Sequence, residues 1–250
     1  MENNMTQVQE NVVINKVKNF VNISSHTLFH FTDSYGTLLK ILENGLKYSL
    51  LYEKIPDKNL AYFTYCACLC DIPLSMVGNH VSTYGRYAIG IKRGSPIAQK
   101  ASPVFYIKEG VYSKRKTIEL CKEYKDNFFI TRRLKPILGK FIKGDRTYQR
   151  VRFYDEKEWR IFPNDGKDTF LEIEKYKNEN DLQNKLKVYQ KNEKNYPPAK
   201  FDIVEDLEYI ILSKESEVKD FLAFINDKFP SRKEDILPKL LYYNRIKSDF

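Results

Sequence analysis

The amino-acid sequence predicts an α+β fold with a mixed sheet at its core. The sequence contains apolar runs typical of buried strands and amphipathic patterns typical of helices. Their order along the chain is irregular, whereas in a doubly wound sheet strands and helices alternate strictly. Hydrophobic residues make up 42% and aromatic residues 14% of the 250 residues, which is ample for a globular core. No internal repeat or clean linker divides the chain. We therefore expect a single domain over 1–250, with a polar lead-in over 1–24 and a basic helical insertion over 108–150.

The first half of the chain carries most of the predicted strands. A helix after the first strand is marked by leucines at helical spacing, by Asp33 or Ser34 as N-cap and by Gly45 as its stop. Pro73 is expected to end regular pairing, because proline lacks a backbone N–H donor. A short helix is predicted over Leu74–Val81, and the predicted strands are Leu28–Phe31, Leu60–Cys70, Tyr84–Ile91 and Pro103–Ile107.

The second half begins with a helical pattern over Lys114–Lys143, interrupted by Pro136. An apolar run, Glu208–Leu212, is typical of a central strand. It precedes an amphipathic helix that Ser213 is expected to cap. The remaining predictions are a strand over Phe153–Phe162 and an exposed helix or excursion over Asn178–Asn195.

Positive charge is concentrated in the predicted insertion. The chain has a net charge of +9, and Lys114–Arg150 holds twelve lysines and arginines against four acidic residues. Such a block can follow a phosphate backbone, and we assign Arg132, Arg133 and Lys135 to a nucleic-acid surface. The alternative is a lysine-rich surface that only faces water.

The cysteines and the N-terminus indicate a cytoplasmic protein. Residues 1–10 lack the apolar core of a signal peptide, and no run approaches the length of a membrane span. Cys66, Cys68 and Cys70 alternate along a predicted strand, but a fourth zinc ligand would have to be Cys121 or His80, at no recognisable spacing. We therefore predict buried thiols and no metal site.

The stretch Phe153–Phe162 holds two carboxylates, Glu156 and Glu158, and the single tryptophan, Trp159. In an extended backbone, residues two apart point to the same face, so both carboxylates would line one edge of a site. The alternative is an acidic turn in front of an amphipathic strand.

Three separated motifs resemble the ADP-ribosyltransferase fold of the His-Tyr-Glu type: His30-Phe31-Thr32, then Tyr84 or Tyr87, then Glu158. The sequence is also similar to the AbiGi family of abortive-infection proteins from phage-resistance loci. The similar stretches are Leu28–Thr32, Ile41–Leu46, Cys70–Ser75, His80, Tyr84–Gly90 and Phe153–Arg160.

The transferase resemblance implies NAD as a substrate and a role for each matching residue. Glu158 would stabilise the oxocarbenium-like state as the glycosidic bond breaks, and Glu156 would orient the acceptor. His30 would bind the ribose. The remaining contacts to NAD would come from Phe31, Thr32, Tyr84 or Tyr87, and Arg160, which could instead pair with Glu158.

Two functions follow from these resemblances. The first is a phage-defence enzyme that transfers ADP-ribose from NAD to a protein or nucleic acid. The second arises because AbiGi proteins are described as antitoxins whose partner resembles a nucleotidyltransferase toxin. In that case the chain would be a non-catalytic antitoxin that binds the toxin or operator DNA, since a fold does not prove an activity.

Overall fold

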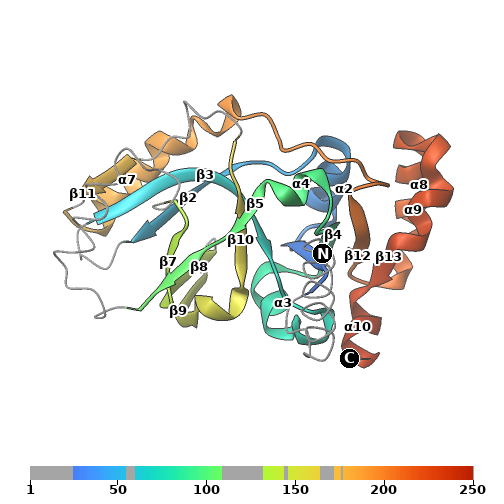
Figure 1. Cartoon of the computed structure of the whole chain (residues 1–250), viewed down its shortest axis with the longest axis horizontal. Helices are drawn as coiled ribbons and strands as arrows, with labels where there is room; N and C mark the ends of the chain where they lie inside the picture. The colour runs from blue at the N-terminus through green and yellow to red at the C-terminus, as the bar shows by residue number, and fades with distance from the viewer. Residues whose placement is uncertain are drawn as a thin grey trace, which may run out of the picture.

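A nine-stranded mixed sheet forms the centre of the molecule in the computed structural model (Figure 1). The structure describes residues 25–54, 60–108, 132–143, 146–163, 172–175 and 177–249, so the predicted lead-in lies outside it. Seven strands follow the order β13-β12-β4-β1-β3-β10-β5, and β2 and β11 pair with the far part of β3. The described residues thus confirm an α+β architecture with a mixed sheet.

The long strand β3 connects the two parts of this sheet. Its eleven residues pair with β1 and β10 near one end and with β2 and β11 near the other. The strands of the sheet are β1 (Thr27–Thr32), β2 (Ser49–Lys54), β3 (Leu60–Cys70), β4 (Tyr87–Lys92), β5 (Ala101–Pro103), β10 (Glu158–Ile161), β11 (Glu172–Lys175), β12 (Leu207–Leu212) and β13 (Leu240–Tyr242).

Helices cover both faces of the sheet. One face packs against α2 (Tyr35–Asn44), α4 (Pro96–Gln99), α8 (Val218–Lys228) and α9 (Lys233–Ile236), and the other packs against α3 (Gly78–Tyr84) and α10 (Tyr243–Asp249). A further helix, α7 (Glu179–Gln190), places Leu182 and Leu186 against Phe63 at the far end of β3. The core therefore has two layers divided by the sheet.

Strands β1 and β3 are joined at a single residue pair, Phe29↔Cys70. By contrast, β1 pairs with β4 at six positions, from Thr27↔Lys92 to Thr32↔Tyr87. Beyond the single pair, Nδ1 of His30 donates to the carbonyl oxygen of Cys68 at 2.8 Å. A side chain therefore provides a contact that a backbone ladder would otherwise make, and we call this junction the β1–β3 seam.

Gly85 allows the chain to turn from α3 into β4. Its φ is +116°, and a Cβ placed there would lie 2.3 Å from Cα of Asp33 and 2.3 Å from the carbonyl oxygen of Thr32. Only glycine fits such a close backbone approach. This turn ends α3 at Tyr84, so the prediction that Tyr84 begins the strand is wrong. Of the two predicted site tyrosines, Tyr87 lies on β4 and Tyr84 lies on α3.

The helical prediction for the basic insertion is wrong over its described C-terminal part. Leu134–Pro136 forms β7, Leu138–Lys143 forms β8 and Arg146–Arg152 forms β9. β8 and β9 make an antiparallel hairpin, and β7 pairs with β6 (Phe105–Ile107) in a parallel two-stranded sheet. Strand pairing, of β7 with the distant β6 and of β8 with the adjacent β9, here outweighs the helical spacing of the apolar residues. The rest of the insertion, apart from Lys108, lies outside the described residues.

The strand predicted over Phe153–Phe162 is shorter than expected. Phe153–Glu156 forms a 3-10 helix, Lys157 adopts a left-handed conformation with φ 42°, and β10 begins at Glu158.

The caps of the helices also differ in part from the prediction. Ser34 caps α2, as predicted, whereas Lys214 rather than Ser213 precedes the turn that leads into α8.

Candidate functional site

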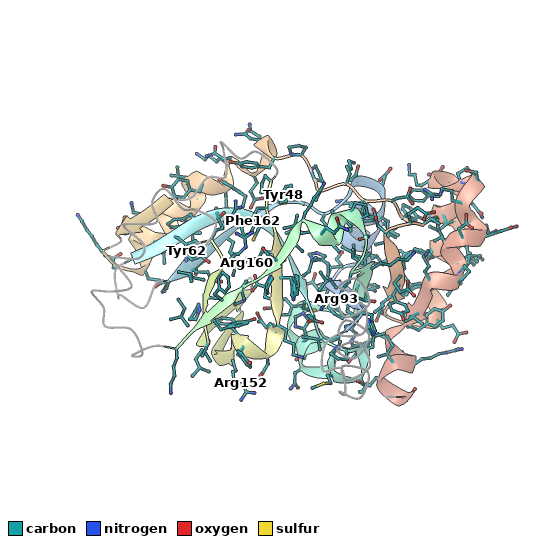
Figure 2. All side chains as sticks on the ribbon, viewed as in Figure 1. Tyr48, Tyr62, Arg93, Arg152, Arg160 and Phe162 are labelled. Atoms are coloured by element: carbon teal, nitrogen blue, oxygen red, sulfur yellow. The ribbon has the colours of Figure 1, made fainter. Side chains whose placement is uncertain are left out.

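Strand β10 places Glu158 and Arg160 on one face of the sheet. In its antiparallel register with β3, Glu158 lies opposite Cys70 and Arg160 lies opposite Cys68. Opposite residues share a face, so both charged side chains lie over the cysteine-lined face of β3. Figure 2 shows Arg160 beside Tyr62, which comes from the same strand as the cysteines. This face carries the candidate site.

Lys135 from β7 binds both predicted carboxylates. Its ammonium donates to Oε2 of Glu156 at 2.7 Å and also to Oε2 of Glu158. All three residues are buried. The left-handed turn at Lys157 is what allows Glu156, on the 3-10 helix, to meet Glu158 at one ammonium group.

Arg160 binds the other oxygen of Glu158 and connects β10 to β2 and β3. Its Nε donates to Oε1 of Glu158 at 2.5 Å, and its Nη2 donates to Glu53 of β2 at 2.7 Å. Its Nη1 donates to the hydroxyl of Tyr62 at 2.7 Å and to the carbonyl of Arg132 at 2.9 Å. The guanidinium is fully buried and donates to four acceptors, so it is held in one orientation.

The ion pairs with Lys135 and Arg160 determine the charge state of the buried Glu158. Burial alone would raise the pKa of Glu158, but Arg160 and Lys135 outweigh it and lower that pKa to about 2. Burial would lower the pKa of Lys135, yet the surrounding glutamates hold it well above its ordinary value. Glu53 differs, since burial raises its pKa despite its cationic neighbours. At neutral pH, Lys135 and Glu158 therefore form a charged, buried ion pair.

The histidine predicted to bind ribose lies at the β1–β3 seam. Because Nδ1 of His30 donates to Cys68, Nε2 is its remaining acceptor in the neutral ring. Burial lowers the pKa of His30, so the ring is neutral at pH 7. Its neighbours Phe31 and Thr32 are buried, and Phe31 packs on the side of α3.

Tyr84 and His80 on α3 complete one wall of the site. The Tyr84 hydroxyl donates to Oε1 of Glu156 at 2.5 Å, and the ring of His80 lies 4.4 Å from that of Tyr84. Burial, reinforced by Lys135, lowers the pKa of His80 to about 4. Burial and the charge of Glu156 raise the pKa of Tyr84. Both rings are therefore neutral hydrogen-bonding groups at pH 7.

The other predicted tyrosine does not join this group. Tyr87 packs with the core that holds α2 and α8, on the opposite face of the sheet from the cysteines. Its hydroxyl donates to Oε1 of Glu217 at 2.7 Å, and its ring lies 5.9 Å from that of Tyr35. The structure thus brings together Glu156, Glu158, Arg160 and Tyr84, places His30 at the neighbouring seam, and leaves Tyr87 outside.

The three cations assigned to a nucleic-acid surface are not an open basic surface. Lys135 and Arg133 are 6% and 4% exposed, and Lys135 is held by carboxylates. Arg132 and Arg133 both lie over the ring of Phe162, at 4.1 Å and 4.8 Å from its centroid. The sequence shows the positive charge of this segment but not the burial that changes its role.

Several members of the site gave no recognisable signal in the sequence. Glu53 and Tyr62 meet Arg160 only because β2 and β3 pair across the same face. His80 entered the sequence analysis as a possible metal ligand and as a position similar to AbiGi proteins, with no role beside a tyrosine. Among the described residues, no group of three or more side chains is placed to hold a metal ion. Cys66 and Cys68 are free thiols whose Sγ atoms lie 3.7 Å apart.

Comparison with known proteins identifies a family. The family model described as "Putative abortive phage resistance protein AbiGi, antitoxin" matches residues 63–213. That range contains β3 from Phe63 onward, the 3-10 helix and β10. It thus includes four residues of the buried charge network: Lys135, Glu156, Glu158 and Arg160. Searches of curated proteins and of solved structures found no match.

Two further observations accompany the match. No helix within the described ranges has both the length and the apolar character needed to cross a lipid bilayer. The match covers more than half of the chain, from Phe63 within β3 to the residue after the end of β12. The chain therefore belongs to the AbiGi family of abortive-infection phage resistance proteins.

Proposed function

We propose that this protein is the antitoxin of an abortive-infection pair and that it acts by binding a cognate toxin protein. The observation that carries this proposal is the family match, whose description names an antitoxin. The resemblance that the sequence shows to AbiGi proteins makes a nucleotidyltransferase-like toxin the expected partner.

The closed charge network supports a binding role rather than a catalytic one. Both carboxylate oxygens of Glu158 already accept hydrogen bonds, one from Lys135 and one from Arg160. A carboxylate that stabilises a transition state must face the reacting atoms, whereas this one faces two buried cations. Replacing Lys135 by a substrate would leave its ammonium buried without its partners, which is costly.

Transfer of ADP-ribose from NAD is the competing hypothesis. In its favour, His30 and Glu158 reach β3 from its two sides, because β1 and β10 both pair with that strand. Against it, Glu158 is engaged by Lys135 and Arg160, and the Tyr84 hydroxyl is engaged by Glu156. The arrangement of these side chains therefore does not fit NAD, and we derive no reaction step from it.

Growth assays in bacteria test the proposal directly. The chain expressed alone should leave growth unchanged, and co-expression with the toxin encoded beside it should restore growth that the toxin alone arrests. The two proteins should also co-purify as a complex. Glu158→Asp, which keeps the negative charge, serves as the variant that separates binding from catalysis, because it should rescue growth as the natural chain does.

The opposite pattern would support the enzyme. Growth inhibition by the chain alone, relieved by Glu158→Asp at equal protein levels, would overturn the antitoxin proposal. A rise in melting temperature with NAD, absent for Glu158→Asp, would point the same way, because a ligand that binds only the folded state stabilises it.

A further inference from the structure

Cys66 and Cys68 form a pair of thiols on β3. Residues two apart on a strand share a face and stand roughly 7 Å apart, because each residue advances the chain by about 3.3 Å. The two sulfur atoms nevertheless lie 3.7 Å apart, so the side chains lean toward each other. Cys68 and Cys70 have the same spacing, but within the described part of the chain no contact joins their sulfurs. The spacing along the strand therefore does not by itself explain the contact between Cys66 and Cys68.

A bridging ion fits this pair better than a disulfide does. A disulfide needs Cβ atoms about 3.5–4.5 Å apart, well below the roughly 7 Å between residues two apart on a strand. The backbone is not free to close this gap, since Cys66 pairs with Ser49 of β2 and Cys68 pairs with Arg160 of β10. A metal–thiolate bond is about 2.3 Å long, so an ion between two sulfurs spans up to about 4.6 Å. The observed sulfur–sulfur distance lies within that reach.

The number of available ligands selects the kind of ion. Structural zinc takes four ligands, and in the described ranges no three or more side chains are placed to share one metal ion. Cu(I) is stable with two thiolate ligands alone, and soft thiolates are the ligands that it prefers. A pair of cysteines without further ligands therefore suits Cu(I) and does not suit zinc.

A positive group beside the pair offsets the charge of such a complex, since Cu(I) between two thiolates carries one negative charge. Burial lowers the pKa of Arg132 and Cys66 acts in the opposite direction, so this sulfur lies within electrostatic reach of the guanidinium. Nε of Arg132 is buried and has no hydrogen-bond partner among the described residues. A buried donor of this kind is uncommon in folded proteins. An anionic complex at Cys66 would give the Arg132 charge a counterpart.

We propose that Cys66 and Cys68 bind one Cu(I) ion as a two-coordinate site. The ion replaces the two thiol protons, which leave to solvent, and neither the metal nor the sulfurs change oxidation state. Cys66 is 2% exposed whereas Cys68 is partly exposed, so the ion reaches the pair from the side of Cys68. Arg132 is a positioning residue that stabilises the anionic complex. The site goes beyond the antitoxin proposal, because both ligands lie on β3 and no toxin takes part.

Competition against a chromophoric Cu(I) chelator, without oxygen, measures the affinity of the full chain. We expect one Cu(I) per chain, and native mass spectrometry should count one Ag(I) per chain when this redox-inert ion is the probe. X-ray absorption of the Cu(I) complex should show sulfur neighbours only. Zn(II) should not form a one-to-one complex at this pair, because zinc requires further ligands.

Alanine variants identify the ligands. Losing a group that only supports a metal ligand typically weakens binding by about 10–100-fold, so losing a ligand itself, in Cys66→Ala or Cys68→Ala, should cost on the order of 100-fold or more. Cys70→Ala is the matched control, because Cys70 is buried on the same strand with the same spacing from Cys68. It should bind Cu(I) as the natural chain does. Cys121→Ala, which removes the remaining cysteine, should also leave binding unchanged.

Arg132→Gln tests the role of the nearby charge. It should weaken Cu(I) binding by on the order of tenfold while the absorption spectrum still shows sulfur neighbours only. Arg152→Gln is the control, since Arg152 is exposed and pairs with Asp155, and it should have no effect.

The measurements on the natural chain keep the site testable even if an alanine variant does not fold. Absence of a one-to-one Cu(I) complex, or oxygen or nitrogen neighbours around the ion, would overturn the proposal. Equal losses in Cys66→Ala and Cys70→Ala, or a loss in Cys121→Ala, would overturn the assignment of the two ligands.

Discussion

Nζ of Lys135 lies 2.7 Å from Oε2 of Glu156, and both side chains are almost completely buried. The two residues are twenty-one positions apart in the sequence, and the contact joins the small β6–β7 sheet to the turn before β10. The same ammonium also holds Glu158. A cation from a segment that looks like a basic surface is therefore the centre of the network.

Loss of Lys135 should strongly destabilise the fold. Lys135→Met keeps much of the side-chain volume but leaves Glu156 and Glu158 as buried carboxylates close to each other. Removing one partner of a buried pair typically costs about 3–5 kcal/mol of unfolding free energy. Lys54→Met is the control, since the Lys54–Glu179 pair is exposed and should contribute about 1 kcal/mol or less. Denaturant titrations measure both, and equal losses would contradict the network.

Glu158→Gln should lower stability whether or not NAD is present. The amide keeps the shape of the carboxylate but loses its charge, so Lys135 and Arg160 lose a shared partner. We expect a loss of roughly 2–4 kcal/mol in unfolding free energy. Asp155→Asn, which removes an exposed carboxylate, should cost about 1 kcal/mol or less. If Glu158→Gln were as stable as the natural chain, the carboxylate would be available to a ligand and the competing enzyme hypothesis would gain.

Mild acid should destabilise the protein through His80. Its pKa is lowered from 6.5 to about 4, so between these values the unfolded chain binds a proton that the folded chain does not. Stability must then fall as the pH decreases, by about 2 kcal/mol between roughly pH 7 and pH 5. Glu158 contributes only below its ordinary value of 4.5, outside this window.

The His80→Phe variant isolates this contribution, because phenylalanine fills the space between Phe31 and Tyr84 without titrating. The variant should show a shallower dependence on pH, with a residual slope from His30, whose pKa is also lowered. Equilibrium unfolding at several pH values gives both slopes. Equal slopes in the variant and the natural chain would rule out His80 as the source.

Gly85→Ala should severely destabilise the fold, because a Cβ at this positive φ would meet the backbone of Thr32 and Asp33. We expect a loss on the order of 3 kcal/mol or more. Gly78→Ala is the matched control at the start of α3, where a Cβ would meet nothing within 4 Å, and it should be neutral. Thermal melts followed by circular dichroism compare the two, and a neutral Gly85→Ala would show that the turn is formed differently.

The strands with long apolar runs were predictable from the sequence. β1 and β3 lie where their apolar runs indicated, and the same holds for β12, since strands buried on both faces need continuous hydrophobic residues. The helix α2 was also predictable, because Ser34 and the glycine at position 45 mark its ends. The strands β7, β8 and β9 were not, because their pairing partners are distant or follow a turn that periodicity does not reveal.

The sequence predicted some members of the site but not the contacts between them. The motif around Glu158 indicated a carboxylate-rich edge, and Arg160 was already considered as its partner. The role of Lys135 was out of reach, because a lysine in a basic segment gives no sign of burial, and only the β6–β7 pairing brings it to the glutamates. Tyr87 was misplaced as a site residue because the glycine turn puts α3, not β4, beside Glu156.

The β1–β3 seam makes the joining of the two halves of the sheet depend on side chains. Six residue pairs join β1 to β4 and six join β2 to β3, whereas β1 and β3 are joined by one residue pair and the His30 ring. Arg93, which follows β4, adds an ion pair with Asp71, which follows β3, and both halves pack into one hydrophobic core. Under the antitoxin proposal, a partner that contacts both halves would add further contacts across the seam, whereas a partner on one half would leave the junction to these side chains.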